Sequence, residues 1–176
     1  MTFEIKKVGV IGAGTMGSGI AAHLANAGVE VLLLDMPQSG FGKKNHLAEQ
    51  AIERLQKADP AAFMTPKAAK FITPGNLEDD LEKLSTCDWV IEAIIENIEA
   101  KQGLYQKLEK LLQPHAIISS NTSTILLQEL IKNRTSAFQA SFMITHFFNP
   151  PRYMRLLEIV KSPLTDPKKV EAIKLF

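Results

Sequence analysis

The sequence predicts an α/β fold built on a doubly wound sheet, and three observations support this prediction. A short β-branched run, Val8 to Ile11, leads into a cluster of glycines. Good helix formers follow, and a second apolar run, Val29 to Leu34, ends on a single acid. Further apolar runs then alternate with segments of helical spacing along the chain. This alternation is typical of a sheet that is parallel in its first part.

The glycine cluster has the spacing Gly12-x-Gly14-x-x-Gly17 and lies between the first expected strand and the first expected helix. Asp35 follows Gly17 at close to the spacing of about 20 residues expected for a ribose-binding acid. Gly12 permits a tight turn, Gly14 leaves no Cβ where a pyrophosphate approaches, and Gly17 allows close packing of helix on strand. Together these features predict a Rossmann-type, dinucleotide-binding turn. A ligand-free glycine-rich turn is the alternative.

The same segment indicates which dinucleotide binds. The turn residues Gly12, Ala13, Gly14, Thr15, Met16 and Gly17 would present the free N–H groups of a helix start to the phosphates. A carboxylate at Asp35 accepts hydrogen bonds from the hydroxyls of an adenosine ribose and repels the 2′-phosphate of NADP. Met36 and Pro37 supply no arginine to bind that phosphate. The sequence therefore favours NAD as the cofactor.

The remaining elements follow in order. Residues 36–42 read as a loop, and the proline-rich stretch from Pro60 to Pro74 resembles an insertion. The hairpin-like tail, Ser141 to Val160, predicts antiparallel C-terminal strands because only a short turn is available to reverse the chain. We expect helices near 45–59, 67–71, 79–84, 100–112 and 126–131 and from 167 onward, and strands near 71–73, 89–95, 116–119, 141–145 and 155–160.

Composition limits the possible functions. The chain has 176 residues, a formal net charge of +1 and 22% charged residues, so no strong field points to nucleic acid or to an anionic membrane. No apolar run has the length of a membrane span, and the first residues do not form a signal peptide, so a cytoplasmic location is expected. Cys87 is the single cysteine and should pack as a small buried hydrophobe. The scattered acids show no metal-ligand pattern.

Polar residues follow several of the expected strands. Asp35, Glu96, Asn121, Ser123 and His146 all stand at or just beyond the carboxyl end of an apolar run. In doubly wound sheets, ligands bind at that edge. We therefore expect these side chains to surround one site.

His146 and Glu158 are candidates for acid–base chemistry. If 155–160 folds back against 141–145, the two side chains meet across the hairpin. A carboxylate on one ring nitrogen fixes the tautomer and leaves the other nitrogen as a base near neutral pH. Apolar neighbours surround Glu158 in the sequence, which predicts a carboxylate that needs a partner. A strand-end histidine beside a solvated edge glutamate fits the spacing equally well.

Four further residues are weaker candidates. Ser123 and Asn149 have the groups to hydrogen-bond a substrate oxygen, although both residue types are also common in turns. Glu96 and Lys101 are compatible with an exposed ion pair at a helix start. Lys101 is equally compatible with a contact to the cofactor.

Taken together, these motifs resemble the L-3-hydroxyacyl-CoA dehydrogenase family, specifically its N-terminal NAD-binding domain. The resemblance covers most of the chain, and several dispersed motifs in the right order are more specific than the glycine turn alone. The matching segments are Gly-Ala-Gly-Thr-Met-Gly at 12–17, Asp35, Glu-Ala-Ile-Ile-Glu-Asn at 92–97, Ser-Asn-Thr-Ser at 120–123, His-Phe-Phe-Asn-Pro at 146–150, and Glu158.

The resemblance implies a role for each candidate. It implies that His146 and Glu158 form the catalytic pair and that Ser123 and Asn149 position the C3 oxygen of a 3-hydroxyacyl-CoA. NAD would be bound by Gly12 to Gly17 and Asp35, together with Glu96, Lys101 and Asn121. The implied reaction is hydride transfer from C3 to NAD in fatty-acid β-oxidation or butyrate-type metabolism.

The chain departs from the family pattern in two ways. Similar enzymes continue into a C-terminal helical domain that binds substrate and forms a homodimer, whereas residues 1–176 correspond to the NAD-binding domain alone. The Pro60 to Pro74 stretch resembles longer, fused members, and Arg54 and Lys57 are only guesses for residues that grip CoA. Two alternatives stay open. One is a related dehydrogenase of a hydroxy acid or sugar acid, and the other is a non-catalytic NAD-binding module.

Overall fold

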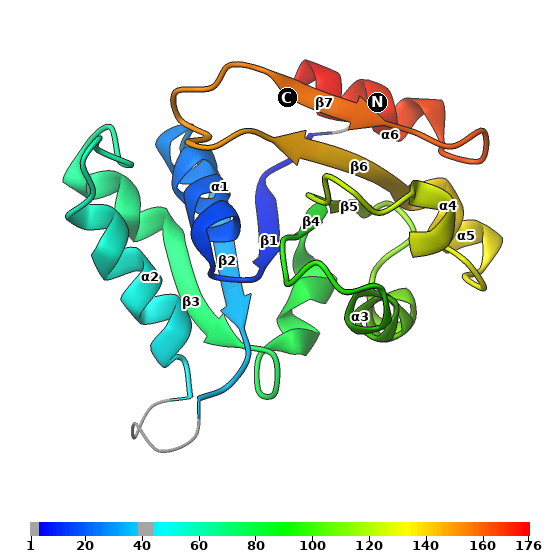
Figure 1. Ribbon diagram of the computed structural model, residues 1–176, viewed down its shortest axis with the longest axis horizontal. Helices are drawn as coiled ribbons and strands as arrows, with labels where there is room; N and C mark the ends of the chain where they lie inside the picture. Colours follow the sequence, from blue (N-terminus) through cyan, green and yellow to red (C-terminus); the bar gives the residue numbers. More distant parts are fainter. Residues whose placement is uncertain (1–3, 39–43) are drawn as a thin grey trace.

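The computed structural model describes residues 4–38 and 44–176, and it confirms the predicted α/β fold. Within these residues, seven strands form one sheet in the order β3-β2-β1-β4-β5-β6-β7 (Figure 1). Neighbouring strands are parallel except for β6 and β7, which are antiparallel as expected. The strands are β1 (Lys7–Ile11), β2 (Glu30–Asp35), β3 (Ile72–Asn76), β4 (Trp89–Glu92), β5 (Ile117–Ser120), β6 (Phe142–Phe147) and β7 (Leu157–Val160).

Helices cover both faces of the sheet and create two apolar cores. On one face, α1, α2 and α6 pack against strand residues such as Val10 and Leu33. On the other face, α3, α4 and α5 cover Ile11 and Leu34. Successive strand residues point to opposite faces, which explains why the strands read as continuous apolar runs. The helices are α1 (Thr15–Asn26), α2 (His46–Gln56), α3 (Ile98–Leu111), α4 (Leu127–Leu130), α5 (Ser136–Ser141) and α6 (Pro167–Leu175), with the 3₁₀ helices η1 (Pro66–Phe71) and η2 (Leu81–Thr86).

The strand order reverses between β1 and β4. From β1 the chain builds outward through β2 to β3, and from β4 it builds in the opposite direction to β7. The connections after β1 and β4 therefore diverge and leave a crevice beyond the carboxyl ends of these two strands. Gly12 follows β1 and Glu92 ends β4, so both lie at this crevice.

Two strands differ from the sequence prediction. The expected strand at 89–95 ends at Glu92, because the Glu92 carboxylate accepts a hydrogen bond from the Ile94 N–H (2.8 Å) and the chain turns away, leaving Ile95 72% exposed. The short strand expected at 71–73 extends to Asn76 as β3. Proline within β3 is tolerated because this edge strand pairs only with β2 in the sheet. The stretch read as an insertion thus supplies part of the sheet itself.

Two further differences lie in the second half of the chain. The sequence prediction missed α5, whose N-cap Thr135 accepts a hydrogen bond from the Phe138 N–H (3.3 Å). The last strand is shorter than expected and begins at Leu157. The final helix is confirmed, since Asp166 caps α6 through the Lys168 N–H (2.8 Å). Residues 39–42 of the loop expected at 36–42 lie outside the described residues.

Candidate functional site

The glycine turn after β1 is held by very close contacts. Gly12 has a φ of +106°, and a Cβ placed there would lie 2.4 Å from the Ala93 carbonyl oxygen. A Cβ on Gly17 would lie 1.8 Å from the Gly12 carbonyl oxygen, which leaves room only for glycine. At Gly14, by contrast, no described atom lies within 4 Å of the Cβ position. The turn is therefore tight where helix meets strand and open where a ligand would approach.

The first helix and the acid after β2 both face this turn. Helix α1 begins at Thr15, and its N-cap residue, Gly14, makes no side-chain capping bond, so the helix start is available to an anion. The Asp35 carboxylate accepts hydrogen bonds from the N–H groups of Ala13 (2.5 Å) and Met36 (2.6 Å). These contacts fix an anionic group at the end of β2 beside the turn. The open space at Gly14, the uncapped helix start and this carboxylate fit a dinucleotide.

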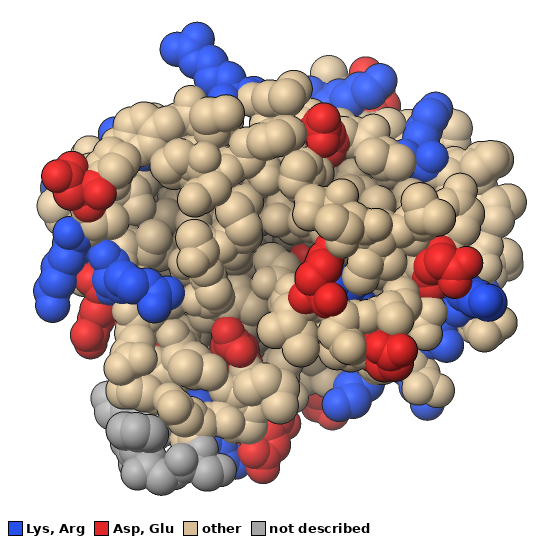
Figure 2. Space-filling view, viewed as in Figure 1, with Lys and Arg blue, Asp and Glu red and all other residues tan. Residues whose placement is uncertain are grey.

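A groove of 590 Å³ lies at the crevice and brings most of the predicted site residues together. Figure 2 shows this side of the molecule hollowed near its centre, with most lysines and arginines toward its rim. Five predicted residues lie outside the lining, namely Gly12, Ala13, Gly17, Asp35 and Glu158. We call this feature the central groove, and its lining residues are Gly14, Thr15, Met16, Ala93, Ile94, Ile95, Glu96, Lys101, Asn121, Ser123, His146, Phe147, Phe148 and Asn149.

The two residues of the expected hairpin pair stand directly opposite each other on β6 and β7. His146 Nδ1 lies 2.9 Å from a Glu158 carboxylate oxygen, and the Phe148 ring contacts the imidazole edge-on at 4.6 Å between centroids. The imidazole is 21% exposed, whereas the Glu158 side chain is 52% exposed. The expectation of an apolar setting for Glu158 is therefore wrong, because β7 is an edge strand and its outer face meets solvent.

The expected exposed ion pair between Glu96 and Lys101 takes a different form. Lys101 is only 1% exposed, and its ammonium lies 3.2 Å from Glu96. Glu96 also accepts hydrogen bonds from the Thr122 and Thr124 hydroxyls. Burial alone would raise the pKa of Glu96, but these hydroxyls and the Lys101 ammonium outweigh it and lower the pKa to about 2. The carboxylate is thus ionised throughout the neutral range.

Four other residues named from the sequence make fewer contacts. The Asn121 side-chain oxygen accepts the Phe147 N–H (2.9 Å), which ties the end of β5 to β6, and Asn121 lines the central groove. Ser123 and Asn149 are exposed at the groove. Arg54 donates to the Ala13 carbonyl oxygen at 3.3 Å, so it lies beside the glycine turn.

The sequence analysis missed a buried polar cluster beneath the groove. Glu92 is completely buried and contacts Lys101, Tyr105 and Ser120 at 2.6 Å each. The signal was available, because a single acid inside the apolar run from Trp89 to Ile95 requires hydrogen-bonding partners if it is buried.

The structure also bears on the single cysteine, on metal-ligand groups and on membrane-spanning helices. Cys87 is fully buried, as expected, and burial raises the pKa of its thiol to about 11, which keeps it in the unreactive protonated form. Within residues 4–38 and 44–176, no group of three or more His, Cys, Asp or Glu side chains could hold a metal ion. None of the helices in this part of the chain is long and apolar enough to cross a membrane.

The fold and the groove define a dinucleotide-binding Rossmann domain. The family model described as "3-hydroxyacyl-CoA dehydrogenase, NAD binding domain" matches residues 7–176. The chain therefore belongs to the 3-hydroxyacyl-CoA dehydrogenase family, of which it is the NAD-binding domain.

Individual relatives agree with this assignment. A Deinococcus radiodurans protein named "Probable 3-hydroxyacyl-CoA dehydrogenase" is 51% identical over 173 residues, which cover 98% of this chain and 50% of that protein. A Bacillus subtilis protein of the same name is 43% identical over 98% of this chain and 24% of its own length. The crystal structure of 3-hydroxybutyryl-CoA dehydrogenase from Escherichia coli K12 matches with a TM-score of 0.79 at 28% identity, covering 98% of this chain and 36% of that one. The chain thus spans about half or less of these relatives.

Proposed function

We propose that the protein containing this chain oxidises 3-hydroxyacyl-CoA to 3-oxoacyl-CoA, with His146 as the base. The observation that carries this proposal is the 2.9 Å contact between His146 Nδ1 and Glu158, at the end of a groove that also contains the glycine turn. NAD, when bound, supplies the hydride acceptor. Fatty-acid β-oxidation or a butyrate-type pathway is the proposed setting.

In this proposal, each side chain of the groove has a defined task. Ser123 and Asn149 hydrogen-bond the C3 oxygen and orient the hydroxyl toward the imidazole. His146 Nε2 takes the hydroxyl proton as the C3 hydrogen departs with its electron pair, and the C3–O bond becomes a carbonyl. Glu158, on Nδ1, keeps the tautomer that leaves Nε2 unprotonated and then stabilises the imidazolium. In the reverse direction the same imidazolium returns the proton.

We assign protein residues to the parts of NAD from their positions in the fold. The start of α1 and Gly12 to Gly17 receive the pyrophosphate, and Asp35 receives the adenosine ribose. Glu96, Lys101 and Asn121 line the central groove together with His146. We assign them to the nicotinamide half of NAD. A following helical domain would close over the acyl chain and form a homodimer.

Replacement of the proposed base tests this function directly. In the complete protein, His146→Gln should lower turnover of acetoacetyl-CoA with NADH by about 100- to 10,000-fold, because proton transfer loses its donor and acceptor. Fluorescence titration with NADH should give an unchanged dissociation constant, since the glycine turn is intact. Unchanged turnover would refute the role of His146.

The substrate class is tested in the same assay. Acetoacetate without CoA is the comparison for the related hydroxy-acid or sugar-acid dehydrogenases. A preference for acetoacetyl-CoA supports the proposal, whereas equal rates would support the related enzymes. Binding of NADH with no reduction of either compound would support a non-catalytic module.

A further inference from the structure

Glu92 is a completely buried carboxylate that accepts four hydrogen bonds. It ends β4 on the sheet face covered by α3, so its side chain points into the core and not into solvent. One carboxylate oxygen accepts from the Lys101 ammonium (2.6 Å) and the Ile94 N–H (2.8 Å), and the other accepts from the Tyr105 hydroxyl and the Ser120 hydroxyl, each at 2.6 Å. Each oxygen of this buried carboxylate thus accepts two hydrogen bonds, which use its acceptor positions fully.

The donors come from three different parts of the fold. Lys101 and Tyr105 belong to α3, Ser120 ends β5, and Ile94 lies in the loop between β4 and α3, residues 93–97. Burial and the neighbouring Glu92 carboxylate raise the pKa of Tyr105 well above its ordinary value, so the phenol keeps its proton and acts as the donor. Glu92 therefore joins β4, β5, α3 and the 93–97 loop at one point.

Lys101 connects this cluster to the central groove. Its ammonium lies between two carboxylates, the buried Glu92 at 2.6 Å and the partly exposed Glu96 at 3.2 Å. Both Lys101 and Glu96 line the groove, while Glu92, Tyr105 and Ser120 lie behind it. The Lys101 ammonium is thus held by Glu92, which does not reach the groove, and by Glu96, which lines it.

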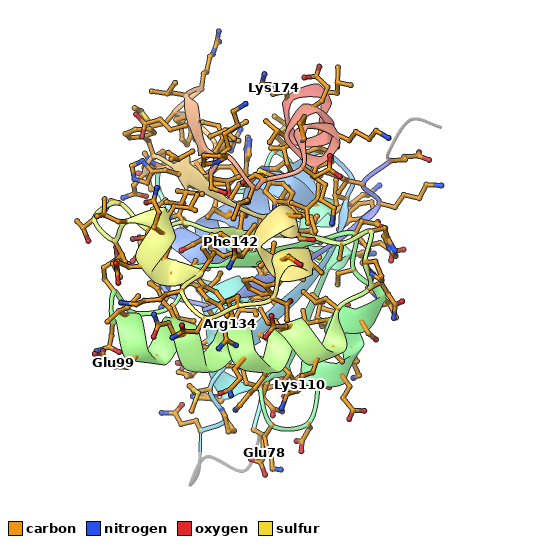
Figure 3. The ribbon with its side chains drawn as sticks, turned by 90° about the vertical axis from the view of Figure 1, so that its right-hand side faces the viewer. Glu78, Glu99, Lys110, Arg134, Phe142 and Lys174 are labelled. Carbon is orange, nitrogen blue, oxygen red and sulfur yellow. The ribbon has the colours of Figure 1, made fainter. Side chains whose placement is uncertain are left out.

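Helix α3 has other attachments that do not involve Glu92. Figure 3 shows α3 crossing the face with Glu99 near its beginning and Lys110 toward its end, and Arg134 lies next to it. Arg134 pairs with Glu109 of α3 at 3.2 Å. Apolar contacts from Leu104 and Leu108 fill the core beneath the helix. A buried ion pair is weak evidence for stability, because apolar groups of similar volume often replace one at no cost. Helix α3 thus has attachments to the fold that are independent of the cluster.

We propose that Glu92, together with Tyr105 and Ser120, positions the Lys101 ammonium and, through it, Glu96 at the central groove, and so sets the affinity for NAD. This inference rests on the assignment of Lys101 and Glu96 to cofactor binding in the proposed function. It does not depend on the catalytic role of His146. The three residues act through Lys101 and need not touch the cofactor.

A double-mutant cycle tests the inference in the 176-residue chain. Tyr105→Phe removes one hydrogen bond to Glu92 but keeps the ring packed against Phe138 and Phe142. We expect the dissociation constant of NADH, measured by fluorescence titration, to rise about fivefold, a change of about 1 kcal/mol that matches the net effect of one typical hydrogen bond. In a Lys101→Met background, the same substitution should change it by less than about twofold, because the group that Glu92 positions is gone. An equal effect in both backgrounds would overturn the inference.

A matched pair of neighbouring serines separates positioning from general stability. Ser119 and Ser120 are both completely buried on β5 but point to opposite faces of the sheet. Ser119 bonds the Trp89 indole N–H (2.9 Å) and the Thr145 hydroxyl (2.7 Å), away from Glu92. Both Ser120→Ala and Ser119→Ala should lower the melting temperature, and by similar amounts. Only Ser120→Ala should weaken NADH binding, by severalfold, whereas Ser119→Ala should leave the NADH dissociation constant unchanged.

The outcomes also distinguish this inference from the proposed function. If Lys101→Met leaves the NADH dissociation constant unchanged, the inference is overturned, but hydride transfer assisted by His146 still stands. Equal losses of NADH affinity in the two serine variants would likewise overturn it, since both would then act through stability. A loss of turnover in His146→Gln has no bearing on either result.

Discussion

The two ends of the central groove are built in different ways. At the cofactor end, function depends on backbone and close packing, as in the 1.8 Å clearance that excludes a Cβ at Gly17. At the hairpin end, the proposed chemistry depends on two side chains, His146 and Glu158, brought together by strand register at the edge of the sheet. Glu158 is half-exposed and contributes little to the core. Substitutions at the first end should therefore damage the fold, and those at the second should damage only the chemistry.

The largest effect on stability and NADH binding is expected from a single methyl group added in the glycine turn. Gly17→Ala would force a Cβ against the Gly12 carbonyl oxygen, so we expect the free energy of unfolding to fall by about 3 kcal/mol and NADH binding to be lost. Gly14→Ala is the matched control, because its Cβ meets no described atom within 4 Å. It should keep the stability of the parent in urea denaturation but weaken NADH binding by filling the phosphate space. A stable Gly17→Ala chain that binds NADH would contradict this account of the turn.

At the hairpin end, we expect a substitution to reduce turnover and to leave stability nearly unchanged. In the complete protein, Glu158→Gln should reduce turnover by about 10- to 100-fold, because an amide stabilises the imidazolium less well than a carboxylate. The melting temperature should stay within about 2 °C of the parent, since an exposed pair contributes less than about 1 kcal/mol. Steady-state kinetics and thermal denaturation on the same samples check both values. A large loss of stability with normal turnover would reverse the comparison between the two ends.

The smallest expected effect lies between the two ends, at Glu96. Its pKa in the folded chain is about 2, below the ordinary value of 4.5, so its contribution to stability is complete above pH 4.5 and is lost as the pH falls toward 2. Glu96→Gln should therefore be less stable than the parent at pH 7, by no more than about 1 kcal/mol because the side chain is 38% exposed. The difference in melting temperature should narrow at pH 3. A difference independent of pH would show that the charge of Glu96 does not contribute.

The cofactor end could be predicted from sequence because its determinants are local. The glycine spacing, the following helix and Asp35 lie within about 25 residues. The role of each can be argued from local backbone geometry or steric limits, without knowledge of the rest of the chain. The parallel first part of the sheet followed from the alternation of elements, and the antiparallel tail followed from the short turn before the last strand. Proline concealed the extent of β3, since Pro74 is compatible with a strand only at the edge of a sheet.

The groove wall was harder to predict because its contacts span long distances in the chain. Glu92 meets Ser120 only because β4 and β5 are neighbours in register, and it meets Tyr105 only because α3 packs on that face. The exposure of Glu158 could not be decided from the sequence, where a solvated edge glutamate fitted the spacing as well as one among apolar neighbours. The exposure of a strand residue depends on whether its strand lies at the edge of the sheet. Such information is absent from local spacing.

The antiparallel pairing of β6 and β7 constrains which changes of length the chain tolerates. His146 and Glu158 are partners in register, and side chains alternate between the two faces of a strand. An insertion in the connecting residues 148–156 leaves that pairing intact provided both strands keep their partners. An insertion of one residue between Leu157 and Glu158 that leaves Leu157 opposite Phe147 turns the carboxylate to the opposite face. Across homologous chains, length variation should therefore be concentrated in the connection and be absent from the four residues of β7.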